Sequence, residues 1–337
     1  LSRFALFTTY FIHICFAFFL LLLQRQNNIV THFIIGGFDT LSRPTAVGVA
    51  ILITYLLAVL ANMANIMFII SDKRLHKPMY LLICNLAVVD IVYTSSCSPT
   101  MIGVLLAGVN TISYVECLIQ MCVFTLGTSM ESFVLAFMAL DRFIAIIYPF
   151  QYHSYLTNTR VVVLTFILWF VNWCFMCYMP ATVVPLPHCS SRLKYSFCDF
   201  AAIIRTTCVN PEKYFNEAAI IMFFILFFTF VFICLTYCGI LLFVKLSSNN
   251  EKKKIGSTLV SHLICVIVHY CPAFVRIIFT RFGVVLTLEE RQGLVIGAVL
   301  GPCLVNPFVY CLRTKEIKQK LFKIFKRHHC DRFLKSL

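Results

Sequence analysis

Long apolar stretches alternate with short polar or basic stretches along most of this chain. A helix needs about 20 mainly apolar residues to cross the roughly 30 Å hydrocarbon core of a bilayer. We interpret seven such stretches as spans, and one further apolar stretch precedes them. The pattern therefore predicts an all-α integral membrane protein, a seven-transmembrane helix bundle. The expected spans are Ala46–Ile70, Met79–Ala107, Tyr114–Ile147, Val161–Pro180, Phe215–Leu246, Ile255–Arg281 and Glu290–Leu312.

Basic residues mark one side of the predicted bundle. Lys73 and Arg74 follow the first span, and Lys252 begins a run of three lysines before the sixth. A tail rich in Lys and Arg starts at Arg313. Because cytosolic loops of membrane proteins carry an excess of Lys and Arg, we expect an extracellular N-terminus and a cytosolic C-terminus.

The spans divide the chain into an outer segment at 1–44, a helical domain at 45–312 and a cytosolic tail at 313–337. The outer segment contains an apolar stretch at 4–23, which we interpret as signal-like or artefactual. An eighth helix is the alternative, and it would place the N-terminus in the cytosol. In the tail, apolar positions spaced three and four apart at 315–327 predict a short amphipathic helix that binds anionic membrane lipids.

Composition narrows the class of protein. With 60% hydrophobic and 12% charged residues, the chain is too apolar for a water-soluble domain. The net charge of +14 could suggest a nucleic-acid partner, but the basic clusters lie between apolar stretches, so we expect no nucleic acid. Most of the 17 cysteines lie within apolar stretches, where cysteine behaves as a small hydrophobic residue. Cys330 in the tail is a candidate for acylation.

Four short motifs lie near the ends of predicted spans: Leu75–Tyr80 (LHKPMY), Met138–Phe143 (MALDRF), Ser257–Leu263 (STLVSHL) and Asn306–Tyr310 (NPFVY). In this order they resemble the odorant receptor family of rhodopsin-like G-protein-coupled receptors. The family versions read LHxPMY, MAYDRY, KAxSTCxSH and NPxxY. The resemblance covers roughly residues 33–325. Leu140 and Ile147 depart from it, since the family has Tyr and Cys there.

The resemblance implies a plasma-membrane receptor that binds a small-molecule odorant within the helix bundle and activates a stimulatory heterotrimeric G protein. A non-olfactory rhodopsin-like receptor for a lipid-like ligand is the alternative. Two acids inside spans, Asp90 and Glu131, also raise the possibility of an ion transporter, but the sequence shows no internal repeat. The chain is not expected to be an enzyme, because it lacks metalloprotease, P-loop and Gly-x-Ser-x-Gly motifs. The sequence does not indicate an oligomeric state.

The resemblance also implies which residues couple to the G protein. Asp141 would hold Arg142 while the receptor is closed, and release would expose Arg142 to the G protein. Pro272 in the sixth span and Pro307 in the seventh lack a backbone N–H and weaken their helices locally, so these helices can bend there. The full set of predicted coupling residues is Asp141, Arg142, Tyr237, Pro272, Asn306, Pro307 and Tyr310.

A ligand-binding face is predicted on the third span. Phe124 and Thr128 are spaced i, i+4 and share one face, with Thr125 beside them. The resemblance adds Ile221, Met222, Tyr270, Ala273, Phe274, Ile277, Ile296 and Val299 from later spans. For each of these residues, simple core packing is the alternative. An aspartate for an amine ligand at position 124 and a lysine for retinal in the last span are both absent from the sequence.

Cysteines near the outer side are candidates for disulfides. Cys117 precedes Asp141 by 24 residues, about 36 Å along a helix, so the two lie on opposite sides of the membrane. The predicted outer loop carries Cys189, Cys198 and Cys208 in an oxidising compartment. The resemblance implies the pairs Cys117–Cys198 and Cys189–Cys208, and free buried thiols are the alternative.

Two carboxylates are predicted near the middle of the membrane. Asp90 and Glu131 each lie about 15 Å from the inner boundary, where an unpaired charge costs at least about 2.5 kcal/mol. They should face each other, or Asn65 and Asn306. Because rhodopsin-like receptors place sodium at the positions of Asp90 and Asn306, the resemblance implies a metal site of Asp90, Glu131 and Asn306, with a shared proton or two neutral packed acids as alternatives.

Overall fold

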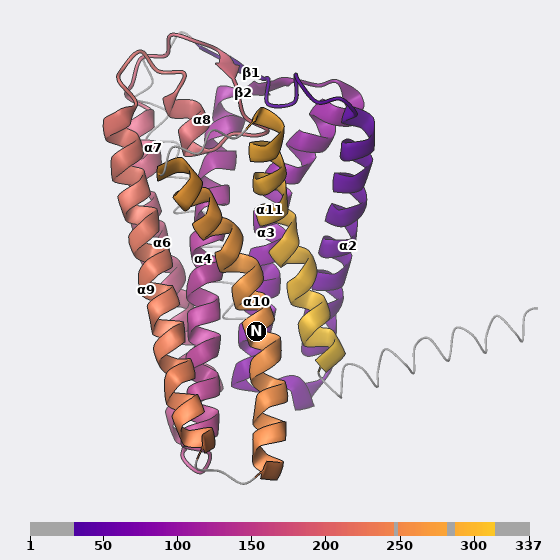
Figure 1. Cartoon of the computed structure of the whole chain (residues 1–337), viewed down its shortest axis with the longest axis vertical. Coiled ribbons are helices and arrows are strands. Elements are labelled where there is room, and N and C mark those ends of the chain that lie inside the picture. The colour runs from indigo at the N-terminus through magenta and orange to yellow at the C-terminus, as the bar shows by residue number, and fades with distance from the viewer. Residues whose placement is uncertain (1–29, 246–248, 282–286, 314–337) are drawn as a thin grey trace, which may run out of the picture.

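The structure is a computed structural model, and it describes residues 30–245, 249–281 and 287–313. The apolar stretch at 4–23, the amphipathic helix predicted at 315–327 and Cys330 lie outside the described residues. Long helices run side by side along the vertical axis of Figure 1, and a small sheet covers one end of them.

Within the described residues, seven long rods form the bundle, which agrees with the seven predicted spans. One of them is interrupted and comprises α6 followed by α7. The rods are α2 (Pro44–Ser71), α3 (Pro78–Ala107), α4 (Tyr114–Ile147), α6 (Asn158–Met176) with α7 (Tyr178–Val183), α9 (Glu212–Lys245), α10 (Asn249–Arg281) and α11 (Leu288–Arg313). Short helices lie between them: η1 (Lys73–Leu75), α5 (Tyr152–Tyr155) and α8 (Phe200–Ile204).

Helix boundaries follow from capping chemistry. Proline occupies the first turn of α2 and α3, where its missing N–H breaks no helical hydrogen bond. Ser113 and Glu116 form a capping box at the start of α4, with Ser113 Oγ accepting from Glu116 N at 3.2 Å. The helix α3 ends at Gly108, whose φ of 68° is the left-handed conformation that glycine adopts without strain.

The fourth predicted span, Val161–Pro180, lies within the apolar segment Asn158–Val183, which is long enough to cross a membrane and consists of two consecutive helices. The structure ends α6 at Met176 and begins α7 at Tyr178, with Cys177 between them. Pro180 explains the break, because its ring excludes the carbonyl of the residue four positions earlier, which is Met176. The remaining spans match observed helices to within a few residues at each end.

A three-stranded sheet lies at the end of the bundle that carries the disulfides, here called the disulfide end. It consists of β1 (His32–Ile35), β2 (Thr111–Ser113) and β3 (Arg192–Leu193), in the order β2-β1-β3. Strand β1 pairs antiparallel with β2 and parallel with β3. The N-terminal strand is thus the centre of the sheet. The opposite end, which carries η1 and α5, is called the Arg142 end.

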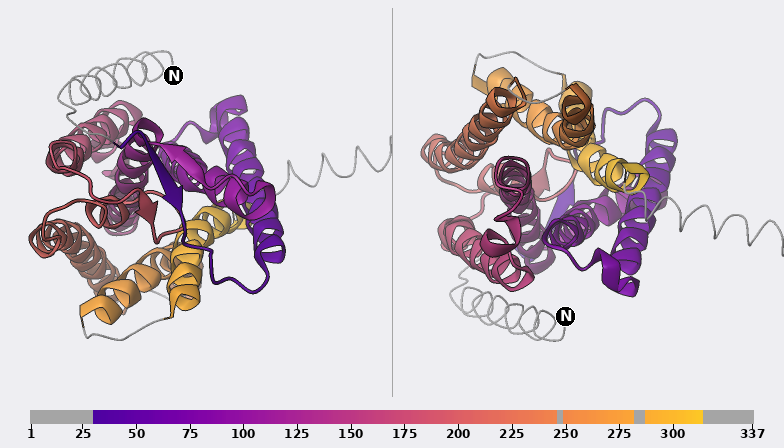
Figure 2. Two further views of the ribbon diagram at one scale, coloured as in Figure 1. Left: turned by 90° about the horizontal axis from the view of Figure 1, so that it is seen from above. Right: turned by 90° about the horizontal axis from the view of Figure 1, so that it is seen from below.

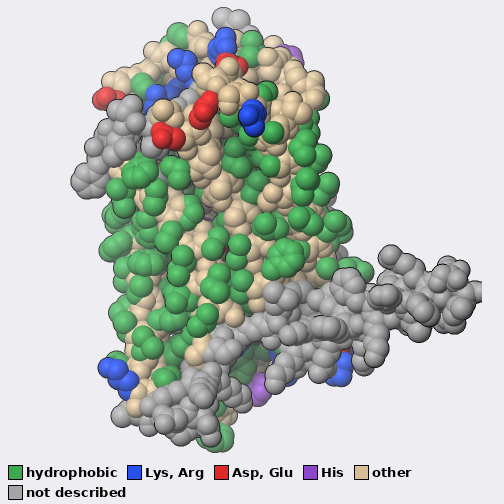
Figure 3. Space-filling model, turned by 45° about the vertical axis from the view of Figure 1, so that its right-hand side comes forward, with side chains coloured by type: hydrophobic (Ala, Val, Ile, Leu, Met, Phe, Trp, Pro, Cys, Tyr) green, Lys and Arg blue, Asp and Glu red, His purple; other side chains and the backbone are tan. Residues whose placement is uncertain are grey.

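The helix α4 is the most enclosed element of the bundle. It packs against α3, α6, α9 and α10, and most of its residues are buried (Figure 2). By contrast, α2 and α9 expose large apolar side chains, with Leu60 63% and Leu242 65% exposed. The space-filling view shows apolar side chains over the middle of the visible face and charged ones near its two ends (Figure 3).

This surface suits a lipid environment, because lipid solvates exposed apolar side chains while water does not. Within the described residues, five helical segments are long and apolar enough to cross a membrane: Pro44–Ser71, Pro78–Ala107, Asn158–Val183, Glu212–Lys245 and Glu289–Tyr310. The helix α4 carries Glu131, Asp141 and Arg142, and its central place lets protein rather than lipid surround their side chains.

Candidate functional site

Two disulfides lie at the disulfide end: one joins the loop between α7 and α9 to α4, and the other closes within that loop. Cys117 at the start of α4 is bonded to Cys198, with a Cα–Cα distance of 5.3 Å, and Cys189 is bonded to Cys208 at 5.0 Å. These are the two pairs that the resemblance implies. The first pair links residues 81 positions apart, so it fixes the loop over the end of the bundle.

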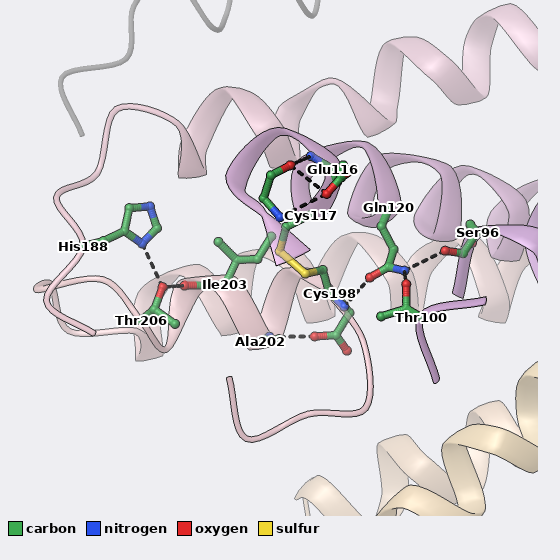
Figure 4. Close-up of a disulfide and its surroundings, with 12 residues drawn as sticks. Ser96, Thr100, Glu116, Cys117, Gln120, His188, Cys198, Ala202, Ile203 and Thr206 are labelled. Atoms are coloured by element: carbon green, nitrogen blue, oxygen red, sulfur yellow. Dashed lines mark hydrogen bonds between the residues drawn. A yellow bond between two sulfur atoms is a disulfide. The ribbon is translucent and has the colours of Figure 1, made fainter. Parts of the chain in front are cut away.

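A glutamine that the sequence did not single out supports the first disulfide (Figure 4). The Oε1 atom of Gln120 accepts from the backbone N–H of Cys198 at 2.7 Å. Its Nε2 donates to the carbonyl of Ser96 at 2.6 Å and to Oγ1 of Thr100 at 2.7 Å. Gln120 therefore connects α3, α4 and the loop, and no motif in the sequence indicated it.

His188 holds a second group of contacts at this end. Its Nδ1 lies 2.8 Å from Oγ1 of Thr206, and its ring meets Phe33 and Tyr114 edge-on, each at 5.5 Å between centroids. Burial lowers the pKa of His188, because desolvation disfavours the charged imidazole. The neutral ring thus joins β1, α4 and the loop.

The predicted ligand residues fall into separate buried clusters. Phe124, Ile296 and Val299 lie in one cluster, where the ring of Phe124 is 5.3 Å from that of Tyr93 and 4.8 Å from that of Phe197 in the loop. Phe124 and Val299 are therefore close to the loop that the disulfides fix.

Tyr270, Ala273 and Phe274 belong to a different cluster, which includes residues of α3, α4, α9 and α10. The hydroxyl of Tyr270 donates to Oγ1 of Thr229 at 2.7 Å, and its ring lies 5.3 Å from Phe230. The hydrogen bond to Thr229 places Tyr270 at the boundary between α9 and α10.

The other predicted ligand residues have simpler surroundings. Thr125 and Thr128 donate to the carbonyls of Met121 and Phe124, one turn earlier in α4. Met222 packs at the edge of a third cluster, and Ile221 is half-buried on α9. The side chain of Ile277 lies outside the described residues.

Arg142 is held at the Arg142 end as the sequence predicted. Its Nη2 lies 2.8 Å from Oδ2 of Asp141, whose side chain is fully buried, while Arg142 is 20% exposed. The structure adds a partner, because the hydroxyl of Tyr152 in α5 donates to Oδ1 of Asp141 at 2.6 Å. Burial beside that carboxylate raises the pKa of Tyr152, which keeps it a hydrogen-bond donor.

The two predicted coupling tyrosines contact other helices. The hydroxyl of Tyr237 lies 2.9 Å from Nδ1 of His262 on α10 and donates to the carbonyl of Leu259. The hydroxyl of Tyr310 donates to the sulfur of Met138 at 3.8 Å. None of these three hydrogen bonds involves Arg142. Pro272 and Pro307 lie inside α10 and α11, where they interrupt the helical hydrogen bonds.

The two mid-membrane acids meet at Asn306. Its Nδ2 donates to Oδ1 and Oδ2 of Asp90 at 3.3 and 3.2 Å, and to Oε1 of Glu131 at 3.2 Å. Asn65 instead donates to the carbonyl of Pro307. The second oxygen of Glu131 lies 3.1 Å from Nδ1 of His269, a residue that the sequence analysis did not consider. Asp90 and Glu131 are therefore not isolated acids but members of a connected polar network.

The network meets some requirements of a sodium site. Two carboxylates and an amide oxygen are hard ligands of the kind that such cations prefer. Here the amide nitrogen of Asn306 faces the carboxylates, and its Oδ1 has no hydrogen-bond partner among the described residues. Turning the amide would offer that oxygen to a cation. Within the described part of the chain, no group of three or more His, Cys, Asp or Glu residues could hold a metal ion by itself.

The sequence agrees with a known family over nearly the whole bundle. The family model described as olfactory receptor matches residues 51–328. The chain belongs to the olfactory receptor family. This family consists of multi-pass membrane receptors and not of enzymes, as the sequence analysis predicted.

Individual olfactory receptors align over similar lengths. Olfactory receptor 2L3 of Homo sapiens is 30% identical over 311 residues, which are 90% of this chain and 98% of that receptor. Olfactory receptor 5G26 of Mus musculus is 29% identical and covers 93% of this chain and 98% of its own length. Olfactory receptor 6F1 of Homo sapiens is 32% identical over 82% of this chain and 89% of its own.

Proposed function

We propose that this olfactory receptor family member binds a small organic odorant within its helix bundle and activates a stimulatory heterotrimeric G protein. The observation that supports this most directly is the state of Arg142. A guanidinium that stays charged is bonded to a buried carboxylate at the end of the bundle, so its release would present a strong donor group to a protein partner.

The proposed orientation puts the disulfide end outside the cell and the Arg142 end in the cytosol. Disulfides form and persist in oxidising compartments, and both are located at one end of the bundle. Lys73 and Arg74 lie at the opposite end, where the excess of positive charge is typical of cytosolic loops. The N-terminus is then extracellular and the C-terminus cytosolic.

The ligand is proposed to contact the cluster around Phe124, Ile296 and Val299, and the group around Tyr270. These residues are mainly apolar, and Thr125 and Thr128 add hydroxyls within one turn of Phe124. A site of apolar walls with a few hydroxyls suits a small organic molecule of mixed polarity.

We also propose that a sodium ion can bind Asp90, Glu131 and Asn306 in the inactive receptor, once Asn306 turns its Oδ1 toward the carboxylates. The ion would supply the positive charge that two carboxylates in a membrane need. In that case, raising sodium lowers agonist potency in the parent and not in Asp90→Asn at equal surface level. Equal sodium sensitivity in both proteins would contradict the site.

The function is tested by screening odorants on cells that express the chain and measuring cyclic nucleotide. We expect at least one small organic ligand to raise it, and Arg142→Ala to remove the response while surface labelling stays near the parental level. Arg74→Ala is the matched control, because Arg74 is exposed and bonded to Asp72 on the same side. Undiminished signalling by Arg142→Ala would contradict the coupling role, and ligand-driven tracer flux would favour a transporter.

A further inference from the structure

A buried histidine outside all four family-like motifs joins two helices in the middle of the bundle. His269 lies on α10. Its Nδ1 is 3.1 Å from Oε2 of Glu131, and its Nε2 is 2.7 Å from Oγ of Ser132, both on α4. Each ring nitrogen of His269 thus meets a side-chain oxygen of α4. We call these three side chains the His269 bridge.

The bridge extends to two more helices. Through its other oxygen, Glu131 accepts from Asn306 on α11, and Asn306 also donates to Asp90 on α3. These polar atoms are buried, so separating α10 from α4 would remove hydrogen-bond partners whose loss costs free energy. The bridge therefore favours the packing of α10 on α4.

The bridge lies beside the place where α10 can bend. Pro272 follows His269 by three residues, and its missing N–H removes a hydrogen bond from this turn of the helix. Toward the Arg142 end, His262 is two turns from His269 on the same face, and its Nε2 lies 3.1 Å from the carbonyl of Leu135. Bending at Pro272 that moves this part of α10 away from α4 must break both contacts.

The bridge also touches the proposed ligand region. The ring of His269 lies 4.9 Å from that of Tyr270, edge to face, and Tyr270 is bonded to Thr229 on α9. Displacing Tyr270 would therefore move the residue next to the bridge.

We infer that the His269 bridge holds α10 against α4 in the resting receptor, and that His269 is a positioning residue that sets the level of ligand-independent signalling. This inference rests on the proposed function. It concerns contacts between helices and requires no bound ion.

The test measures basal cyclic nucleotide per surface receptor in the full chain. His269→Phe keeps an aromatic ring and removes both hydrogen bonds, and we expect basal signalling to rise on the order of 5-fold or more, the usual lower range of coupling between sites. Ser132→Ala removes one partner with little change of volume and should give a smaller rise. Ile267→Phe is the control, because Ile267 is two residues away and 49% exposed on the outside of the bundle.

Unchanged basal signalling in His269→Phe and Ser132→Ala at parental surface level would overturn the inference. An equal rise in Ile267→Phe would also overturn it, since an added ring would then suffice. If His269→Phe does not reach the surface, Ser132→Ala decides. Adding Arg142→Ala separates the two claims: a basal signal that does not depend on Arg142 contradicts the proposed function, whereas an Arg142-dependent signal that His269→Phe leaves unchanged contradicts the bridge alone.

Discussion

The disulfide end and the interior toward the Arg142 end are connected by different kinds of bond. At the disulfide end, two disulfides and the backbone pairing of three strands join the segments. Farther in, the helices are joined by side chains, such as Asp141 with Tyr152 and His269 with Glu131. A disulfide persists through small shifts of a helix, whereas a side-chain hydrogen bond breaks when its two partners separate. One region is thus suited to remain fixed while the other rearranges.

The largest expected effect is at the disulfide end. Cys117→Ser should abolish surface expression, because a native disulfide typically contributes about 2–5 kcal/mol by restricting the unfolded chain. Surface labelling of intact cells measures the amount of receptor that reaches the surface. Cys177→Ser is the control, since Cys177 is a half-buried free cysteine. Near-parental surface level and odorant response in Cys117→Ser would show that the disulfide end does not depend on this bond.

The Arg142 end should respond in activity and not in folding. Tyr152→Phe removes the donor to Asp141, and a hydrogen bond to a charged group contributes about 1.5–3 kcal/mol. We expect basal cyclic nucleotide to rise several-fold at unchanged surface level, because Asp141 then holds Arg142 less firmly. Tyr155→Phe alters an exposed tyrosine of the same short helix and serves as the control. A loss of surface receptor with unchanged signalling per receptor would show that the contacts of the Arg142 end contribute to folding and not to activity.

Substitution of a glycine at the disulfide end should lower stability and leave signalling unchanged. A Cβ added to Gly37 would lie 2.2 Å from the carbonyl carbon of Tyr195, so Gly37→Ala must push the N-terminal segment away from the loop. Such overpacking costs about 1–3 kcal/mol and should lower the melting temperature of purified receptor. Gly103→Ala is the control, because nothing lies within 4 Å of its added Cβ. An unchanged melting temperature for Gly37→Ala would argue against close packing of this segment.

The smallest expected effect is a pH dependence at His188. Burial lowers its folded-state pKa, so below the ordinary pKa the unfolded chain binds a proton that the folded receptor resists. Stability therefore falls as pH decreases below about 6.5, the unperturbed value for histidine. Melting curves between about pH 7 and pH 5 should show a smaller decrease in His188→Phe than in the parent. Parallel curves for both proteins would show that His188 does not cause the decrease.

The sequence predicted those parts of the fold that the membrane requires. Lipid forces each span to be a long apolar helix, so hydropathy located seven rods, and the motif residue Arg142 was correctly paired with Asp141. The break between α6 and α7 could have been predicted from Pro180. Strand β1 could not, because four residues carry too little pattern and both of its partner strands are distant in the sequence.

The candidate site was predicted less completely. His269 lies in an apolar stretch outside the motifs, yet the argument applied to Asp90 and Glu131 also applies to it, since an ionisable residue inside a span needs a partner. The bond from Tyr152 to Asp141 depends on how α5 folds back under α4, which the sequence pattern does not encode.

The central place of β1 has a consequence for the order in which the receptor is assembled. Asp39, just after β1, binds Arg192 at the start of β3, and the two are 153 positions apart in the chain. At roughly 5–20 residues per second, the ribosome makes the second partner on the order of 10–30 s after the first. During that interval the N-terminal strand has only β2 to pair with, so closure of the disulfide end is a late event of biosynthesis. A fusion tag or antibody that binds this segment during translation would therefore act on maturation before it could act on signalling.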